Sequence, residues 1–260
     1  MNPDLRVALA CAAGLLLLLY VVPMVRLKIR HRAGAHLHFA PTSREHVNAR
    51  FLALIDPLLA ALDRMGFTLT GYLDGPGDRS KPSGIRHTVV LRSADATTAA
   101  IVYVIERATP VAQLTANAQF VTDFRGGDSI NTSNSPLPAL FYYPAGRRVY
   151  RFPGATSVAA LYDLHRRLVA RMNAPGVMPQ PSTVDEVMRK IQETTARNLA
   201  YQEERGAYAR TADGDYGFTW KGAARAVALM GPGLKRLWQA RQRGRAADLA
   251  AELLRDPPPG

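Results

Sequence analysis

Hydroxyl and amide side chains crowd the short segment NTSNSP, residues 131–136. A serine becomes a nucleophile when a histidine within hydrogen-bond reach accepts its proton. Ser133 and Ser135 are therefore candidate nucleophiles, with His87 or His165 as the base. The segment has neither a G-x-S-x-G elbow nor an S-x-x-K motif, and Asn-Ser-Pro is an ordinary turn sequence. We expect a turn here, and a hydrolase-like site is the alternative.

Histidines are the second group that could do chemistry. His36 and His38 form an H-x-H pair in a segment without helical periodicity, and such a pair could ligate a soft metal ion. His31 and His46 lie nearby, but no cysteine or carboxylate cluster completes a ligand set, since only Glu45 is close. We therefore expect neither a metal nor any other cofactor.

The period of the apolar residues predicts the elements that would position these groups. Apolar residues recur at three- and four-residue steps from Val47 to Met65, which predicts a helix that begins near Ser43. Short runs rich in valine and isoleucine follow, separated by turn sequences such as RGGD, and one expected hairpin pairs 141–143 with 148–152. A further helix follows, capped by Thr156 or Ser157. The pattern is typical of an α+β fold with an antiparallel sheet of about five to seven strands, packed by long helices.

The C-terminal third is predicted to be mainly helical. Thr183 and Glu186 have the spacing of a capping box, so a helix should begin there. A hairpin is expected near 207–219, and a basic amphipathic helix ends the chain. We therefore divide the soluble part into three ranges. They are an α+β domain at 45–173, a linker at 174–182 and a helical region at 183–260.

An uncharged apolar run occupies residues 7–25, between Arg6 and Arg26. As a helix it would cover roughly 28 Å, close to the hydrocarbon thickness of a bilayer. The basic residues follow the run, so a cleaved signal peptide is not favoured. Cys11 lies near the beginning of the run, where a lipidated cysteine would not be found. We predict a short tail and a transmembrane helix at 1–25.

A basic juxtamembrane linker is predicted at 26–44. It carries four positive charges close to the apolar run, at Arg26, Lys28, Arg30 and Arg32. Positive flanks stay in the cytoplasm, so the N-terminus should lie outside and the domain should be cytoplasmic. Arginine far outnumbers lysine, which is typical of a GC-rich bacterial genome, so the membrane would be a bacterial inner membrane. Export of the domain is the alternative.

The net charge of +12 favours a polyanionic partner, and a solvated basic surface without a partner is the alternative. An anionic inner leaflet attracts each nearby Lys or Arg by about 1 kcal/mol. The C-terminal helix could lie on such a leaflet or pack on the domain through its leucines. Its candidate membrane-surface residues are Lys235, Arg236, Trp238, Arg241 and Arg243.

Three functional hypotheses remain. The first is a non-enzymatic binding or scaffolding module at the membrane face, with the bilayer and an unidentified protein as partners. The second is a membrane-tethered enzyme that uses the hydroxyl-rich segment 131–135. The third is a nucleic-acid-binding regulator, because helix, hairpin and helix follow one another as in a winged helix. Nucleic acid is the least favoured partner, since a winged helix needs two short helices before its recognition helix and 183–206 offers one long one.

Overall fold

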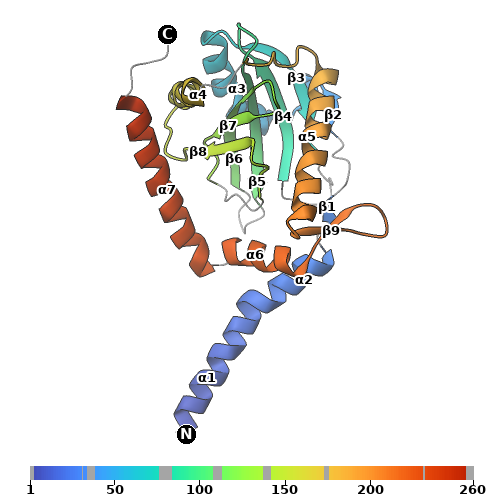
Figure 1. The fold of residues 1–260 in the computed structure, drawn as a ribbon, viewed down its shortest axis with the longest axis vertical. Helices are drawn as coiled ribbons and strands as arrows, with labels where there is room; N and C mark the ends of the chain where they lie inside the picture. Colours follow the sequence, from blue (N-terminus) through green and yellow to red (C-terminus); the bar gives the residue numbers. More distant parts are fainter. Residues whose placement is uncertain are drawn as a thin grey trace. The chain divides into compact units, whose positions relative to one another are not determined.

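The structure is a computed structural model. It describes residues 3–30, 32–33, 39–75, 84–107, 113–136, 142–172, 176–230 and 232–255, with the backbone alone at 32–33, 84–86, 106–107, 113, 230 and 232–235. The chain divides into two compact units, whose helices and strands are labelled in Figure 1. Unit 1 comprises Met1–His36, Leu137–Tyr142 and Thr195–Gln242. Unit 2 comprises Leu37–Pro136, Tyr143–Thr194 and Arg243–Gly260.

Unit 2 is built on a seven-stranded sheet of order β2-β3-β4-β5-β6-β7-β8. The strands are β2 (Ala40–Thr42), β3 (Thr68–Asp74), β4 (Gly84–Arg92), β5 (Ala99–Arg107), β6 (Gln113–Asp123), β7 (Ser129–Ser133) and β8 (Arg147–Arg151). Neighbouring strands are antiparallel from β2 to β7, as predicted. β8 is parallel to β7, so the sheet is mixed and the fold is α+β.

The parallel strand β8 corrects one predicted hairpin. We expected 141–143 to pair with 148–152, but Tyr142 and Tyr143 lie outside any strand, and residue 141 lies outside the described residues. β8 instead pairs with β7 in the register Ser129↔Arg147. Parallel strands cannot be joined by a tight turn, so the chain between them must return to the start of β7.

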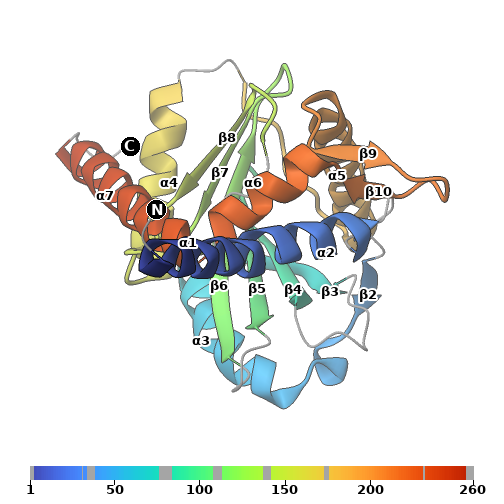
Figure 2. The same ribbon diagram turned by 90° about the horizontal axis from the view of Figure 1, so that it is seen from below.

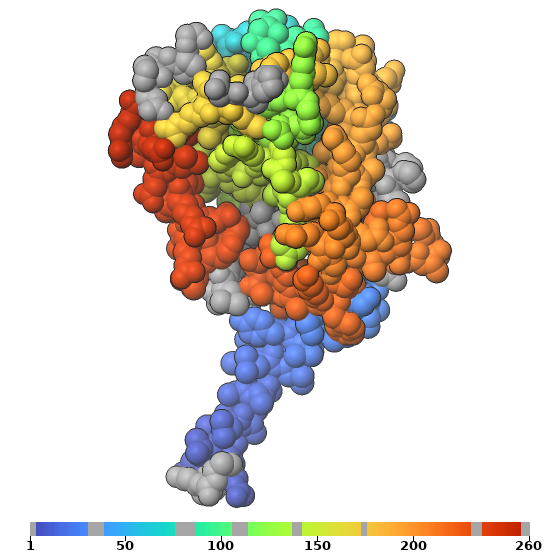
Figure 3. All heavy atoms as spheres, in the orientation of Figure 1, coloured from blue at the N-terminus to red at the C-terminus, as the bar shows by residue number. Residues whose placement is uncertain are grey.

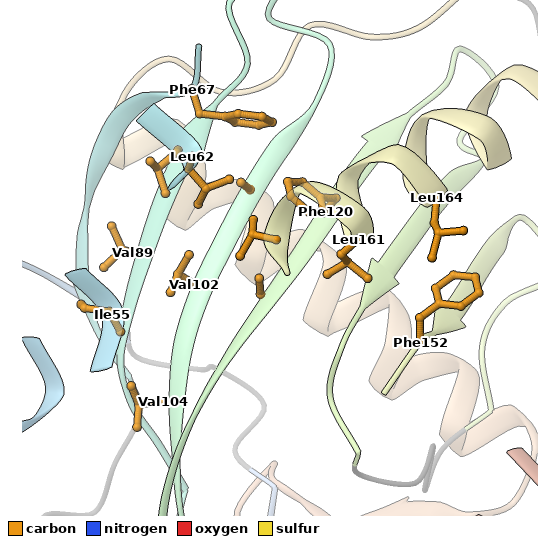
Figure 4. Close-up of a cluster of buried hydrophobic side chains, with 14 of the residues drawn as sticks. Ile55, Leu62, Phe67, Val89, Val102, Val104, Phe120, Phe152, Leu161 and Leu164 are labelled. Atoms are coloured by element: carbon orange, nitrogen blue, oxygen red, sulfur yellow. The ribbon is translucent and has the colours of Figure 1, made fainter. Parts of the chain in front are cut away.

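Two helices cover one face of this sheet. α3 (Ala49–Arg64) begins after Asn48, whose side chain accepts a hydrogen bond from Arg50 N at 2.9 Å. It thus begins later than predicted, and the 3-10 turn η2 (Arg44–His46) precedes it. α4 (Val158–Met172) is capped as predicted, since Ala160 N donates to Ser157 Oγ at 3.1 Å. Figure 4 shows how apolar side chains of α3, α4 and the strands meet between these layers. They include Ile55, Leu62, Val89, Val102, Phe120, Phe152 and Leu161.

The opposite face of the sheet receives the first half of α5 (Val184–Glu204). The predicted capping box is present, because Glu186 N donates to Thr183 Oγ1 and Thr183 N donates to the Glu186 carboxylate, both at 3.3 Å. Val184 and Val187 pack against a small cluster that contains Leu73 of β3 and Val90 of β4. This part of α5 therefore belongs to the core of unit 2.

The last helix, α7 (Pro232–Arg255), contributes its second half to unit 2. Leu253 is fully buried in the main apolar core. Arg167 of α4 donates to the Leu253 carbonyl at 3.0 Å, and Arg171 pairs with Glu252 at 2.8 Å. These turns of α7 pack on the α+β unit.

Unit 1 begins with one continuous apolar helix made of α1 (Pro3–Leu16), the π-helical turn η1 (Leu17–Val21) and α2 (Val22–Arg30). The N–H of Val22 bonds to the Leu17 carbonyl, and Pro23 follows without an N–H of its own. The stretch Asp4–Arg30 is long and apolar enough to cross a membrane, a property that signal sequences share. The side chains from Asp4 to Leu18 are exposed, in the blue part of Figure 3. The helix ends at Arg30, five residues beyond the predicted end at 25.

The rest of unit 1 is a small three-stranded sheet with helices. β1 (Arg32–Ala33), β10 (Tyr216–Phe218) and β9 (Tyr208–Arg210) lie in the order β1-β10-β9. β9 and β10 form the predicted hairpin, in which Gly214 adopts a φ of +83° that favours glycine. α6 (Trp220–Met230) follows, and Gly222 N donates to its cap Thr219 Oγ1 at 3.0 Å.

Candidate binding site on the polar face of the sheet

The two faces of strands β6, β7 and β8 differ in chemistry. Side chains alternate between the faces of a strand, and Phe120 and Ile130 point into the apolar core under α3 and α4. The opposite face carries polar residues in register across the strands, since Gln119 lies beside Ser133 and Ser133 beside Arg151. The polar residues of this face are Asn117, Gln119, Ser129, Asn131, Ser133, Arg147 and Arg151.

Amide side chains on this face are tied together across the strands. Gln119 Nε2 donates to Asn131 Oδ1 at 3.0 Å, and Asn131 Nδ2 donates to Ser129 Oγ at 3.3 Å. Asn131 and Ser133 are 4% and 6% exposed, so these polar groups are buried. Buried polar groups that already have partners form a rigid surface with a defined pattern of donors and acceptors.

Two arginines and two tyrosines meet at the edge of this face. Arg151 Nη2 donates to the Tyr143 hydroxyl at 3.2 Å, and the Arg147 guanidinium lies 5.5 Å from the centre of the Tyr143 ring. Ser135 is hydrogen-bonded to Tyr103, and the charge of Arg151 also acts on that tyrosine. We call these five residues the arginine–tyrosine cluster. It draws its members from β5, β8 and the segments that flank β7 and β8.

The electrostatics of the cluster favour donors of hydrogen bonds. Burial raises the pKa of Tyr103, while its hydrogen bond with Ser135 and the positive charge of Arg151 oppose that shift. A phenol is protonated at neutral pH even at its ordinary pKa, and a guanidinium is always charged there. The cluster therefore offers hydroxyl donors beside two positive charges. Such a set fits an anionic group, because guanidinium N–H groups match the geometry of carboxylate and phosphate oxygens.

The sequence carries a signal for this cluster that the sequence analysis did not use. The strand RRVYR places Arg147, Val149 and Arg151 on one face, because side chains alternate along a strand. Two arginines on the same face of a strand next to a hydroxyl-rich strand indicate a cationic patch. The contacts with Tyr103 and Tyr143 depend on tertiary structure and had no local signal.

The structure separates the predicted nucleophile Ser133 from the predicted base His165. Thr132 points to the α4 face and contacts His165, so its neighbour Ser133 points to the other face. His165 is fully buried, with Nδ1 and Nε2 each 2.9 Å from a threonine hydroxyl, those of Thr132 and Thr122. Burial lowers the pKa of His165 to about 3, so the ring is neutral. His165 serves as a hydrogen-bonded core residue.

His87 also lies away from the two serines. Its Nδ1 is 2.6 Å from Asp74 Oδ1, and its ring packs edge-on against Phe51 of α3, with 5.0 Å between ring centres. β4 and β7 are separated by β5 and β6, which corresponds to about 14 Å at the usual strand spacing. Ser133 and His87 also point to opposite faces of the sheet. Within the described residues, neither predicted base is paired with Ser133 or Ser135.

The predicted membrane-surface residues lie on two helices. Arg26 and Arg30 are exposed on α2, where Lys28 is half-buried, and Arg32 lies in β1 with its backbone paired to Gly217. On α7, Trp238 is half-buried and the side chain of Lys235 lies outside the described residues. The three arginines of α7 that were predicted, Arg236, Arg241 and Arg243, are exposed.

The predicted metal ligands cannot be placed, because His31, His36 and His38 lie outside the described residues. His46 is described, and its Nδ1 lies 2.8 Å from Ser43 Oγ. Among the residues that the structure does describe, no group of three or more His, Cys, Asp or Glu side chains could hold a metal ion.

A second set of arginines surrounds a tyrosine in unit 1. The Arg225 guanidinium lies 4.1 Å from the centre of the Tyr142 ring, and its Nη1 donates to the Tyr142 hydroxyl at 3.2 Å. Arg205 lies 5.4 Å from the centre of the same ring. The buried Gln202 side chain bonds to both the N–H and the carbonyl of Tyr142. These contacts fasten Tyr142 to unit 1 and satisfy its backbone.

The chain matches no protein-family model, no curated protein and no solved structure. The functional conclusion therefore depends on the geometry of the described residues and on the chemistry of the sequence.

Proposed function

We propose that this chain is a single-pass membrane protein whose soluble part is a non-enzymatic binding module for an anionic group. The observation that supports this function is the arginine–tyrosine cluster. In it, Arg147 and Arg151 both contact Tyr143, and the buried Ser135 belongs to the same cluster. Fixed positive charges with neighbouring hydroxyl donors are a common means of recognising phosphate or carboxylate. An anionic side chain of a protein partner would meet the same chemistry.

The apolar helix supports permanent anchorage over a cleaved signal. Leu15–Leu18 are 55–68% exposed, as expected of side chains that face lipid. Met24 and Leu27, farther along the same helix, pack against the core of unit 1. Cleavage after residue 25 would remove Met24 from that contact. Because the end of this helix contributes to the core of unit 1, we favour a helix that stays in the mature protein over one that is cleaved off.

The orientation rests on the positive-inside rule. Arg26, Lys28 and Arg30 follow the apolar stretch directly, so we place the N-terminus outside and the chain after Arg30 in the cytoplasm of a bacterium. Reporter fusions at the C-terminus test this placement. A fluorescent protein should fold there and alkaline phosphatase should stay inactive, and active alkaline phosphatase would overturn the cytoplasmic assignment.

The binding function can be tested with inorganic phosphate as the probe. The full chain in lipid nanodiscs should gain thermal stability when phosphate replaces chloride at equal ionic strength, because a ligand that binds only the folded state raises Tm. Arg151→Gln should abolish the gain. Arg148→Gln is the matched control, because Arg148 is exposed on the same strand and its register partner is Ile130 of the core face. Equal gains in both variants would contradict the proposed site.

A further inference from the structure

The apolar helix enters unit 1 directly at its C-terminal end. Met24 and Leu27 of α2 pack against an apolar cluster that includes Phe218 of β10 and Ala223 of α6. β1 begins two residues after Arg30 and pairs with β10 in the register Arg32↔Gly217. Residues 26–30, which were predicted to belong to a linker, are thus part of a packed helix. The apolar helix therefore packs directly on the rest of unit 1.

The direction of α6 follows from these contacts. α6 begins at Trp220, directly after β10, and β10 lies next to the end of α2 through β1. α6 also contacts η1, which lies nearer the start of the apolar helix. α6 must therefore run back along α2 towards the bilayer, as Figures 1 and 2 show for these helices. Small buried residues, Ala223 and Ala226, allow the close approach.

The length of the apolar helix sets where the bilayer ends. The apolar cluster of unit 1 takes up the helix from Met24 onwards, which leaves about 17 residues from Val7 to Pro23 for the hydrocarbon core, and α6 already contacts the last part of this stretch at η1. They cover about 25 Å as a helix, near the lower limit for a membrane span. η1 is the C-terminal part of this stretch, so the end of α6 that contacts η1 reaches the boundary between the hydrocarbon core and the headgroups.

The chain that follows α6 has the chemistry of an interfacial segment. In the first turns of α7, Leu237 is 53% exposed and Trp238 is half-buried. Arg236 and Arg241 are exposed on the same turns. Tryptophan and leucine favour the boundary between headgroups and acyl chains, and arginine favours the phosphates above it.

We infer that the C-terminal end of α6 and the first turns of α7 form a second membrane contact, which seats unit 1 on an anionic leaflet. Leu237 and Trp238 enter the headgroup region, and Arg236 and Arg241 bind lipid phosphates. This inference rests on the proposed membrane anchorage. It differs from a loosely tethered module, because the contact fixes the height and tilt of unit 1.

The two tryptophans of the chain allow a direct test. Trp220→Phe leaves Trp238 as the only tryptophan, and Trp238→Phe leaves Trp220 at the far end of α6. Each full-length variant is reconstituted into vesicles that contain a phosphatidylcholine brominated near the headgroup. We expect the bromines to quench Trp238 at least twofold more than Trp220. Quenching of Trp238 that does not exceed that of Trp220 would overturn the inference.

A second arm tests the lipid charge. In the Trp220→Phe background, adding phosphatidylglycerol to the vesicles should increase the quenching of Trp238. Arg236→Gln with Arg241→Gln should remove that increase, whereas the control Arg255→Gln, an exposed arginine at the other end of α7, should keep it. An increase that survives the double substitution would contradict lipid binding by these arginines.

Carbonate extraction separates this inference from the proposed function. If the full chain leaves the membrane in carbonate, the anchorage itself is wrong. If the chain stays in the membrane but the bromines do not quench Trp238 more than Trp220, the anchorage is supported and the second membrane contact is wrong.

Discussion

The hydroxyl of Thr132 lies 2.9 Å from Nδ1 of His165, in the interior of unit 2. Thr122 faces the other ring nitrogen at the same distance and also contacts Thr98 at 3.0 Å. A neutral imidazole has one donor and one acceptor nitrogen, so both ring nitrogens are satisfied. The core therefore holds a polar chain that depends on an uncharged histidine.

Lowering the pH should destabilise the protein through His165. The folded pKa is lowered to about 3 from an ordinary value of 6.5, so between these values the unfolded chain binds the proton more readily. Stability is fully present above the unfolded pKa and falls as the pH drops towards the folded pKa, by up to about 1.4 kcal/mol per pH unit. His165→Gln, which cannot titrate, should flatten this dependence in denaturant titrations.

The exposed His46 supplies the control for that measurement. His46→Gln should keep the wild-type dependence between about pH 6.5 and 5, a window chosen because it lies above the range in which most carboxylates titrate. A wild-type slope in the His165→Gln protein would contradict a neutral core histidine.

The ring and the hydroxyl of Tyr142 should contribute separately to unit 1. Tyr142→Phe removes the acceptor for Arg225 Nη1 but keeps the ring beneath the guanidinium, so we expect a loss of about 1 kcal/mol. Tyr142→Leu also removes the cation–π contact and should cost about 1 kcal/mol more. Thermal unfolding of the two variants checks the order, and equal losses would contradict a contribution from the ring.

Gly71 should not tolerate a larger side chain, because α5 packs directly against it. A Cβ at this position of β3 would overlap Cγ2 of Val184, at the first turn of α5. Gly71→Ala should therefore lower the unfolding free energy by about 1–3 kcal/mol. Gly244→Ala in α7 meets nothing within 4 Å and should raise it by up to about 1 kcal/mol. Chemical denaturation of both variants measures the difference, and a neutral Gly71→Ala would show that α5 shifts freely.

Leu27 and Ile29 offer a matched pair on the anchor helix. Leu27 packs against the core of unit 1, whereas Ile29 is 64% exposed. Leu27→Asn should speed the cleavage of reconstituted protein by trypsin at the neighbouring Arg26 and Lys28, because the packing of a half-buried leucine that it removes contributes about 1–2 kcal/mol. Ile29→Asn should leave cleavage unchanged. Similar cleavage rates in both variants would contradict the docking of α2.

Local signals made much of the fold predictable from the sequence. The capping side chains of Ser157 and Thr183 act within one helical turn, so both helix starts could be placed. The hairpin at Gly214 needed only a turn sequence between two short strands. The beginning of α3 was predicted too early, because Ser43 and Asn48 are both residue types that cap helices. In the structure Ser43 precedes the short 3-10 turn η2, and Asn48 caps α3.

The candidate site shows the limit of such reasoning. The serines of 131–135 were identified as a polar group, but their neighbours come from distant segments. Tyr103 reaches Ser135 from β5, and Arg151 lies beside Ser133 only because β8 pairs with β7. The periodicity of the sequence can predict a strand at β8, but it cannot predict which strand will pair with it.

The sequence by itself determined the apolar N-terminal helix, the helix caps, the hairpin at Gly214 and the α+β class, because each depends on residues close together in the chain. Only the tertiary structure decided that β8 is parallel to β7, that Ser133 and His165 face opposite ways, and that α2 continues into the core of unit 1. These outcomes depend on pairing and packing between residues far apart in the chain. Their free energy is gained only when distant segments meet, so no local pattern reports it.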